Sequence, residues 1–550
     1  MTRTLTIFHV TDVHARVGST PRTLPGMRGL MRPDRGVEIH AGLAGIDVLL
    51  QDEMARLGPD TATLLVCCGD LVGTEMATDR HTRGGITFEA LELLRTRSGV
   101  DAAVLVVGNH EVDHGVDRAR ELLDASSFVV VAGNVDLDGA PVSDGIVDVD
   151  VAGLRVGVLG LTTIQTATEA PSPDRPRIDA RKPVAAAREA LSDTAPRDAL
   201  VAAVHLFDEQ DLAIASLDGV DLVLGGHTHA QKSGPLGPRR VHREKAGSHG
   251  LALGRAVLRI EGRRCRIDPR ETALLPPDLA PPPDSPFQAL HDATLKAVRD
   301  ANPAGAVAVA RATWEIGSLD GLRTGEASPL GRTVAQGLLD GAAELSDEPV
   351  HAGIINAGNI RADLVPERGV LPLAALHDTL AFANELVLVE LSPTQVLRVL
   401  RTAIANLKLD RAGWLHTAGL VWNVGARGQL GDVFVRVPRG HRAAMAVPLH
   451  DLAVVRIATI DWLAEGGHHL DVLTRGDTRR TGLKAADAWA ESLRVRRLGD
   501  RLAPLVAPPP MSSVDGGFRC TDTREVLETL DQADPGGFAW AHDALARSRS

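Results

Sequence analysis

The feature that most constrains this chain is a series of short apolar runs in its first 230 residues. Polar loops and helical patterns separate the runs, which read LTIFHV, ATLLVCC, AAVLVVG, FVVVAGN, LRVGVLG, ALVAAVH and DLVLGG. Alternation of such runs with helical segments is typical of an α/β core. Open α/β sheets bind ligands at the carboxyl ends of their strands. We therefore expect the side chains that follow these runs to converge in space.

Five of the expected strand ends carry carboxylate, imidazole or amide groups. These groups are Asp12 and His14, then Asp70, then Asn109, His110 and Asp113, then His205, and finally His227 and His229. Alternation along a strand places Asp12 and His14 on the same side. Taken singly, an Asp-x-His sequence can be a solvated loop and a lone histidine can be structural. The conjunction of five such ends favours a metal site.

The order of the motifs DxH, GD, GNHE, an isolated His and GHxH resembles the calcineurin-like metallophosphoesterases. The resemblance implies an α/β fold, a four-layer αββα sandwich with two metal ions. It assigns one ion to Asp12, His14 and His229 and the other ion to Asn109, His205 and His227, with Asp70 as the bridge. It also implies that His110 is a catalytic, phosphate-contacting residue oriented by Asp113, although Asp113 can also be an ordinary turn carboxylate.

The donor set itself indicates which cations would fit. Carboxylate and amide oxygens mixed with imidazole nitrogens suit Mn²⁺, Zn²⁺ or a similar divalent ion. Two such ions about 3.5–4 Å apart generate hydroxide from a shared water near neutral pH. The expected cofactor is therefore a pair of divalent metal ions.

The second half of the chain contains the phrases GEASPLGRTVAQ, NAGNIRAD and LAFANELVLVEL. These resemble the C-terminal domain of the 5′-nucleotidase and UDP-sugar hydrolase family, an α+β domain, so the resemblance covers residue 1 to about 495. It implies substrate contacts by Asn356, Arg361, Asn384 and Trp414. A guanidinium suits phosphate or carboxylate, and an indole is a stacking platform. Arg361 can instead form a surface ion pair, and Trp414 can instead be a core residue.

Two departures from the family pattern put recognition of a nucleobase in doubt. The GGDGF-like segment reads GGHHL, with His468 and Leu470 at the aspartate and aromatic positions. Arg332 stands where the family has asparagine. The neighbouring His468 and His469 lack further nearby ligands, which disfavours an additional metal site. These departures leave the predicted catalytic groups intact.

Composition divides the chain into four segments. We expect a metallophosphoesterase domain over residues 1–262, a proline-rich connector and linker helix over 263–300, and a substrate-binding domain over 301–496. Residues 497–550 form an extension to which we assign no role. A chain of 550 residues is long enough for two separate hydrophobic cores.

The net charge of −12 argues against binding to nucleic-acid polymers or anionic membranes, since both need positive surfaces. No apolar run is long enough to span a membrane, and the N-terminus MTRTLTIFHV shows no signal peptide. We therefore expect a cytoplasmic protein whose partner is a small phosphate ester. The sequence leaves the oligomeric state open.

These observations predict an enzyme, a 5′-nucleotidase-like phosphomonoesterase that depends on two metal ions. Alternatives that the sequence leaves open are a 2′,3′-cyclic nucleotide phosphodiesterase, a nucleotide-sugar pyrophosphatase and hydrolysis of a sulfate-related ester. A noncatalytic nucleotide-binding module is a further alternative, but no expected ligand is missing from the sequence.

Overall fold

A computed structural model describes most of the chain up to residue 495. The described residues are 2–24, 37–74, 76–171, 173–192, 195–262, 264–311, 322, 325, 328–362, 364, 370–382, 384–409, 411–425, 428–439 and 442–495. The chain forms two compact units that divide between Asp300 and Ala301. The predicted extension over residues 497–550 lies outside the described residues.

The first unit is built around two facing sheets. The seven-stranded sheet has the order β17-β16-β1-β4-β5-β6, with β18 paired to β16. Its strands are β1 (Arg3–Val10), β4 (Thr61–Cys68), β5 (Ala102–Val106), β6 (Val129–Val131), β16 (Leu253–Glu261), β17 (Arg264–Ile267) and β18 (Ala273–Leu275). Because β1, β4, β5 and β6 run parallel, their carboxyl ends meet at one edge of the sheet.

The six-stranded sheet has the order β14-β15-β13-β12-β10-β9. Its strands are β9 (Ile146–Val151), β10 (Leu154–Thr162), β12 (Ala199–His205), β13 (Leu222–Gly225), β14 (Gln231–Leu236) and β15 (Val241–Ala246). Here β10, β12, β13 and β15 run parallel, and the antiparallel β9 and β14 form the edges. Smaller sheets join β2 (Thr20–Leu24) to β3 (Val37–Ala41), and β7 (Val135–Leu137) to β8 (Ala140–Pro141) and β11 (Ile178–Ala180).

Alternation along the strands gives each sheet an inner and an outer face. Leu5 and Ile7 of β1 share one buried cluster with Val156 and Val158 of β10, so this cluster fills the space between the sheets. Phe8, the residue that follows Ile7, belongs instead to a separate cluster on the outer face. The strands are apolar on both faces because both faces are covered.

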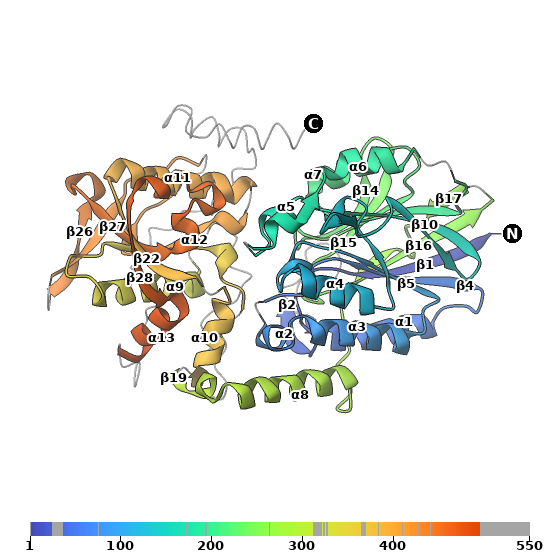
Figure 1. Ribbon diagram of the computed structural model, residues 1–550, viewed down its shortest axis with the longest axis horizontal. Helices are drawn as coiled ribbons and strands as arrows, with labels where there is room; N and C mark the ends of the chain where they lie inside the picture. Colours follow the sequence, from blue (N-terminus) through green and yellow to red (C-terminus); the bar gives the residue numbers. More distant parts are fainter. Residues whose placement is uncertain are drawn as a thin grey trace. The chain divides into compact units, whose positions relative to one another are not determined.

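Helices cover both outer faces of the paired sheets (Figure 1). Leu50 and Leu94 pack in the outer cluster of the seven-stranded sheet, and Ala187 and Ile214 pack in that of the six-stranded sheet. The helices of this unit are α1 (Leu43–Ala55), α2 (Ala77–Thr82), α3 (Gly85–Ser98), α4 (Val116–Ala125), α5 (Gln165–Thr168), α6 (Pro183–Ala190), α7 (Asp208–Ala215) and α8 (Pro286–Ala301). The predicted four-layer αββα sandwich is confirmed.

The segment over residues 263–300, predicted as a connector, begins with strands of the first unit. Both β17 and β18 pair antiparallel with β16. Gly262 has a φ of 59°, a left-handed conformation that glycine adopts easily, at the turn into β17. The paired prolines begin only at Pro276, so the chain is free to form strands before that residue. The sheet therefore extends beyond residue 262.

The second unit has an α+β core around a five-stranded sheet of order β23-β20-β27-β22-β28. The strands of the whole unit, including two smaller sheets, are β19 (Ala308–Arg311), β20 (Ala352–Asn356), β21 (Val370–Pro372), β22 (Glu385–Leu391), β23 (Leu415–Ala418), β24 (Leu420–Val421), β25 (Phe434–Arg439), β26 (Arg442–Pro448), β27 (Val455–Ile460) and β28 (Asp477–Lys484). Its helices are α9 (Pro329–Glu344), α10 (Leu373–Thr379), α11 (Pro393–Leu409), α12 (Asp461–Ala464) and α13 (Ala485–Val495).

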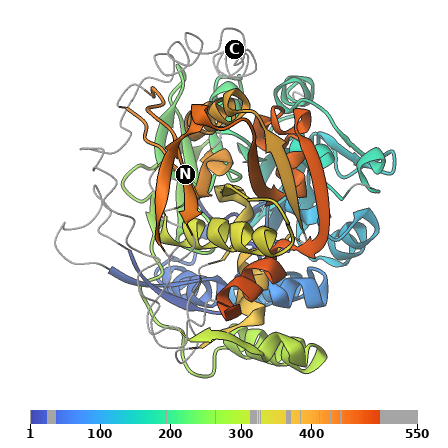
Figure 2. The ribbon, with the colours of Figure 1, turned by 90° about the vertical axis from the view of Figure 1, so that its left-hand side faces the viewer.

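Local sequence explains how α9 begins and how it packs. Ser328 caps the helix by accepting a hydrogen bond from Gly331 N at 3.4 Å, and Pro329 occupies the first helical position. Gly337 lies against the buried ring of Trp489 in α13, where an added Cβ would come within 2.3 Å of the indole. Figure 2 shows α9 in yellow and α13 in red on one side of the sheet. The predicted α+β second domain is confirmed.

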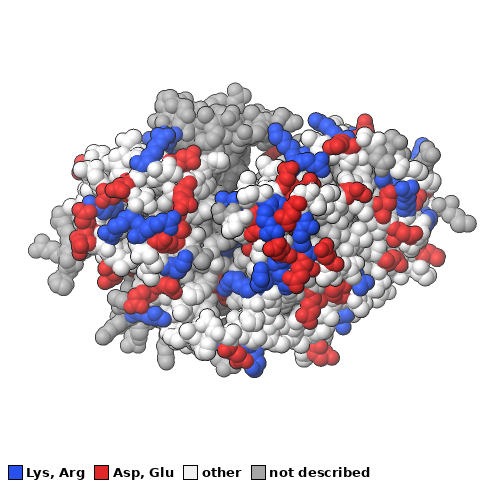
Figure 3. All heavy atoms as spheres, viewed as in Figure 1, with Lys and Arg blue, Asp and Glu red and all other residues white. Residues whose placement is uncertain are grey.

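Within the described residues, no helix is both long and apolar enough to cross a membrane. Lysine and arginine side chains are interspersed with acidic ones on the face shown in Figure 3.

Candidate metal centre

The loops after β1, β4 and β13 hold five of the predicted ligands in left-handed backbone conformations. The φ angles are 49° at Asp12, 47° at His14, 51° at Asp70, 76° at His227 and 55° at His229. Such conformations cost about 1–3 kcal/mol each in residues other than glycine and concentrate at functional sites. Hydrogen bonds between the loops offset this strain, since Asp12 N donates to Gly69 O at 2.9 Å and His14 N donates to Asp70 O at 3.0 Å.

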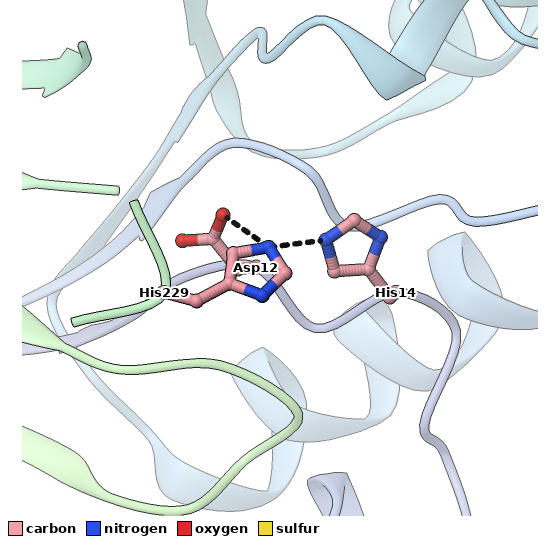
Figure 4. Close-up of side chains that lie close together, drawn as sticks. All are labelled: Asp12, His14 and His229. Carbon is pink, nitrogen blue, oxygen red and sulfur yellow. Dashed lines mark hydrogen bonds and ion pairs between the residues drawn. The ribbon is translucent and has the colours of Figure 1, made fainter. Parts of the chain in front are cut away.

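Asp12, His14 and His229 form the first ligand cluster (Figure 4). His14 Nε2 lies 3.1 Å from His229 Nε2, and His229 Nε2 lies 3.5 Å from Asp12 Oδ1. The backbone N–H of His227 donates to both carboxylate oxygens of Asp12, at 3.0 and 3.1 Å, and so fixes the carboxylate plane. Two imidazole nitrogens and a carboxylate oxygen therefore converge on one point, as a cation requires.

Asp70, His205 and His227 form a second cluster. His205 Nδ1 is hydrogen-bonded to Cys68 O at 2.8 Å, which turns its Nε2 toward Asp70 Oδ2 at 3.0 Å. The rings of His205 and His227 lie 5.0 Å apart. Tethering of one imidazole nitrogen to a backbone carbonyl is the arrangement that orients metal-binding histidines.

Asn109, the remaining residue predicted for this second cluster, has one side-chain atom engaged by the protein and one without a partner in the described part of the chain. Its Nδ2 donates to Glu169 Oε2 at 3.2 Å, so its Oδ1 is the atom left for another partner. Both Asn109 Oδ1 and His227 Nε2 are buried and have no hydrogen-bond partner among the described residues. Buried polar atoms of this kind are costly unless a ligand satisfies them, so the side chains present fit a divalent cation.

The carboxylate of Asp70 lies between the two clusters. Its Oδ2 is 3.0 Å from His205 Nε2 and 3.9 Å from His14 Nε2, while its Oδ1 accepts a hydrogen bond from His110 N at 2.9 Å. Burial favours the neutral acid, but the imidazoles of His205 and His110 hold the pKa of Asp70 well below its usual range. The ionised carboxylate is thus placed to face both clusters, as a bridging ligand would be.

Burial and neighbouring charges shift the pKa values of three other predicted ligands in different directions. Burial disfavours the charged ring of His205, yet the Asp70 carboxylate raises its pKa to about 9. Burial together with the nearby His205 lowers the pKa of His227 well below its usual value, which keeps that ring neutral. Burial also raises the pKa of Asp12. Divalent cations would replace these protons, because metal binding requires deprotonated ligands.

His110 and Asp113 pair as the sequence predicts. His110 Nδ1 lies 2.9 Å from Asp113 Oδ2, and Thr74 Oγ1 donates to the same oxygen at 3.3 Å. His110 Nε2 lies 4.0 Å from Asp70 Oδ2, so the ring faces the centre. Because His14 and Asp70 can hold a cation together with His110, the geometry allows His110 either a ligand role or a substrate-contacting role.

Glu111 is a buried organising residue that the sequence reasoning missed. Its Oε2 accepts hydrogen bonds from Gly108 N at 2.5 Å and Asp70 N at 3.0 Å. Its Oε1 accepts from Leu71 N at 2.7 Å and Val72 N at 3.2 Å. One carboxylate therefore shapes the loops that carry Asp70 and Asn109. The sequence feature that could have identified Glu111 is its position in GNHE, beside the predicted site residues.

His249 is a second missed residue at the centre. Its backbone N–H donates to Asp12 O at 2.8 Å, and its ring centroid lies 5.6 Å from that of His14 and 5.7 Å from that of His229. No strand end or motif marks this position, since His249 lies in a loop of glycine and serine between β15 and β16.

In the second unit, Asn356 and Asn384 belong to one amide chain. Asn384 Nδ2 donates to Asn359 Oδ1 at 2.7 Å, and Asn359 Nδ2 donates to Asn356 Oδ1 at 2.6 Å. Asn356 is fully buried and donates to Ala412 O at 3.2 Å. Its amide is thus engaged by protein groups, so in this arrangement Asn356 supports Asn384 through Asn359. Asn384 is half-buried, at the accessible end of the chain.

Arg361 lies beside this amide chain. Its Nη1 donates to Gly358 O at 3.4 Å, and its Cζ lies 5.7 Å from the ring centroid of Phe382. These contacts hold the side chain in place. A guanidinium carries five N–H donors in a planar fork, a geometry that suits an anionic group.

Trp414 does not lie where a stacking platform must lie. Only 5% of its surface is exposed, and it packs in the core with its ring centroid 5.5 Å from that of Trp422. The predicted stacking role requires an open face, so the burial corrects this expectation and favours the core alternative. Trp414 directly precedes the edge strand β23. It packs in the same core cluster as Leu415, the first residue of that strand.

Trp462, which the sequence reasoning passed over, is the exposed indole of this region. It is 39% exposed, and its ring centroid lies 5.0 Å from that of His468. Gly467 lies against the indole, where an added Cβ would come within 2.4 Å of the ring. Leu470 is fully buried and supplies no wall to a ligand. The altered GGHHL segment therefore places His468, and not Leu470, beside the exposed ring of Trp462 in α12.

The sandwich fold and its two carboxylate and imidazole clusters define a metallophosphoesterase domain. A family model for calcineurin-like phosphoesterases matches residues 5–231, and a model for the 5′-nucleotidase C-terminal domain matches residues 308–475. The chain therefore belongs to the family that joins a calcineurin-like phosphoesterase domain to a 5′-nucleotidase C-terminal domain.

Individual relatives agree with this assignment. The trifunctional nucleotide phosphoesterase protein YfkN of Bacillus subtilis is 25% identical over 74% of this chain and 30% of its own length. A probable 5′-nucleotidase of Treponema pallidum is 29% identical over 41% of this chain and 36% of its own length. The matches thus span about a third of these two relatives. The structure of a 5′-nucleotidase precursor from Thermus thermophilus has the same fold, with a TM-score of 0.71, 23% identity and coverage of 90% of this chain and 96% of that one.

Proposed function

We propose that the chain hydrolyses phosphate monoesters of nucleotides with the help of two divalent ions. The observation that supports this most is the position of the Asp70 carboxylate, which faces the cluster of His14 and the cluster of His205 at 3.9 and 3.0 Å. Two divalent ions in such a site supply a hydroxide nucleophile near neutral pH. The mixed oxygen and imidazole donors favour Mn²⁺ or Zn²⁺.

The side chains of the site have separate roles in this proposal. Asp12, His14 and His229 would hold one ion, Asn109, His205 and His227 would hold the other, and Asp70 would serve both. His110 donates a hydrogen bond from Nε2 to a phosphoryl oxygen, and this hydrogen bond strengthens as negative charge builds on that oxygen in the transition state. Asp113 positions the ring through Nδ1, at 2.9 Å.

The proposed substrate class rests on the second domain and on the relatives. Two relatives are named a nucleotide phosphoesterase and a probable 5′-nucleotidase. Arg361 offers a cation for an anionic substrate group, Asn384 offers an amide, and the exposed Trp462 offers a stacking face for a base. The reaction would place the chain in nucleotide breakdown.

Metal removal tests the proposed function. Protein treated with a chelator is expected to lose phosphate release from 5′-nucleotides and from a chromogenic phosphate ester, and added Mn²⁺ is expected to restore both. Parallel assays with 2′,3′-cyclic nucleotides and nucleotide sugars identify the preferred ester. Protein that binds two metal ions but turns over none of these esters would instead be a binding module.

Trp462 and Trp414, two of the tryptophans of the second unit, are expected to respond differently to truncation. Trp462→Ala should raise KM for nucleotides about 5- to 150-fold, which corresponds to about 1–3 kcal/mol of lost base stacking. KM for the small chromogenic ester should change little, because that ester has no base. Trp414→Ala should instead lower the free energy of unfolding by about 3–5 kcal/mol, as for other buried aromatic residues.

Steady-state kinetics on both esters and denaturant unfolding of both variants check this pair. Equal effects of Trp462→Ala on the nucleotide and on the chromogenic ester would remove Trp462 from the substrate site. An unchanged unfolding free energy in Trp414→Ala would contradict its place in the core.

A further inference from the structure

A buried lysine lies directly behind the candidate metal centre. Lys245, in β15, is 1% exposed and is one of the largest fully buried side chains of the described residues. Its Nζ donates hydrogen bonds to Leu206 O at 2.8 Å, Gly226 O at 2.9 Å and Thr228 Oγ1 at 3.2 Å. An ammonium has three protons, so these oxygens together with a nearby carboxylate satisfy it fully.

Each of these three hydrogen-bonded oxygens belongs to a residue next to a predicted ligand. Leu206 follows His205, and Gly226 precedes His227. Thr228 separates His227 from His229. A single ammonium therefore connects the residue after β12, whose last residue is His205, to the loop after β13, which carries His227.

The charge of Lys245 is balanced on the helix side of the sheet. Asp211 of α7, which is fully buried, has its Oδ2 2.9 Å from Lys245 Nζ, and Asp208 Oδ1 lies 3.3 Å away. Arg243 Nη1 also lies 3.2 Å from Asp208 Oδ1 and 3.6 Å from Asp211 Oδ2. A buried ammonium costs several kcal/mol in lost hydration, which these oxygens offset. A buried ion pair of this kind fixes the geometry around it more than it raises the free energy of unfolding.

The backbone leaves room for this side chain at one position. An added Cβ on Gly225, the last residue of β13, would lie 2.8 Å from Lys245 Cε. The lysine stem thus runs close beside the strand end that leads to His227. Its position is fixed by packing as well as by hydrogen bonds.

We propose that Lys245 is a positioning residue for the second metal subsite. It holds the backbone on either side of His205 and His227 so that both imidazoles keep the spacing one cation needs. This inference rests on the proposed function, because it takes these two histidines as ligands. Groups that orient ligands in this way typically contribute about 10- to 100-fold to metal affinity.

Lys245→Met tests the proposal, since methionine keeps an unbranched apolar stem and removes the ammonium. Calorimetric titration of chelator-treated full-length protein with Mn²⁺ is expected to show two bound ions in the wild type. In the variant, affinity for the second ion should fall about 10- to 100-fold, with the first ion retained. His205→Ala provides the reference for loss of the second ion.

Two further variants separate positioning from folding. Lys245→Met leaves Asp211 buried without its cation, so Lys245→Met combined with Asp211→Asn removes that charge too. The double variant should recover thermal stability and keep the weak second ion. Arg255→Met, which takes a cation from buried Glu53 elsewhere in the unit, should leave both ions bound.

The outcomes distinguish this proposal from the proposed function. Wild-type protein that binds two ions and hydrolyses nucleotides, together with full second-ion affinity in Lys245→Met, overturns the positioning role alone. Recovery of that affinity in the double variant overturns it as well, because the unpaired carboxylate would then be the cause. Wild-type protein that binds fewer than two ions overturns both proposals.

Discussion

Asp70→Asn is expected to abolish hydrolysis and to lower the number of bound divalent ions. The Asp70 carboxylate faces both clusters and is held ionised by the imidazoles of His205 and His110, which keep its pKa low. An amide of the same shape removes the negative charge that offsets two cations at once. The loss in kcat/KM should exceed the roughly 100-fold seen for residues that only orient a ligand.

Elemental analysis of the purified variant and calorimetric titration with Mn²⁺ measure metal binding directly. Asp221→Asn is a matched control, because Asp221 accepts a hydrogen bond from Leu200 N at 2.8 Å in the same unit but belongs to neither cluster. The control should keep both ions and most of its activity. Full activity and two bound ions in Asp70→Asn would contradict the assignment of Asp70 as the bridging residue.

The side chains that gather in the two clusters could be predicted from sequence because their signals are local. Each lies at the end of a strand or shortly after it, and the strands are recognisable apolar runs whose parallel ends must meet at one edge. Asp12, Asp70 and His205 leave three different strands, yet the structure brings them together. The order of the motifs was therefore enough to place the first domain's centre.

The residues that hold the ligands could not be predicted in the same way. Glu111 and Lys245 act through backbone atoms of other loops, which become neighbours only after the sheets pair and pack. Nothing within a few residues of Lys245 marks it as buried, since it lies near the end of a strand of mixed polarity, VHREKA, that leads into the loop GSHG. Long-range contacts of this kind depend on the tertiary fold, which local patterns do not specify.

The second domain shows the same limit for aromatic residues. Both Trp414 and Trp462 stand beside family motifs, and composition does not distinguish them. Trp414 precedes a strand whose inner face is buried, whereas Trp462 lies in the short helix α12, where its ring points away from the core and is 39% exposed. Exposure depends on which face packs inward, and a single tryptophan carries no periodic signal.

The strained backbone at the centre follows from where the ligands lie. Asp12, Asp70 and His227 come one or two residues after a strand end, so the chain must turn sharply to aim their side chains inward. Gly69 and Gly108 leave no room for a Cβ, since one at Gly108 would lie 2.3 Å from Asp70 Oδ1. Glycines beside the ligands thus let two loops meet, while the ligands themselves accept left-handed φ angles.

His110→Asn is expected to lower kcat about 100- to 1,000-fold while both metal ions remain bound. The ring has its Nδ1 on Asp113 at 2.9 Å, so Nε2 is the nitrogen that faces the centre. Removal of one donor that stabilises transition-state charge costs about this much in other hydrolases. KM should change little, because the interaction strengthens mainly in the transition state.

Metal content decides between the two roles that the geometry allows His110. If His110 were a ligand with His14 and Asp70, His110→Asn would lose an ion, and the fall in activity would follow metal occupancy. If it contacts the phosphoryl group, excess Mn²⁺ will not restore the rate. Asp113→Asn should then give a smaller loss than His110→Asn, because Asp113 acts only through the ring, and the double variant should be no slower than His110→Asn alone.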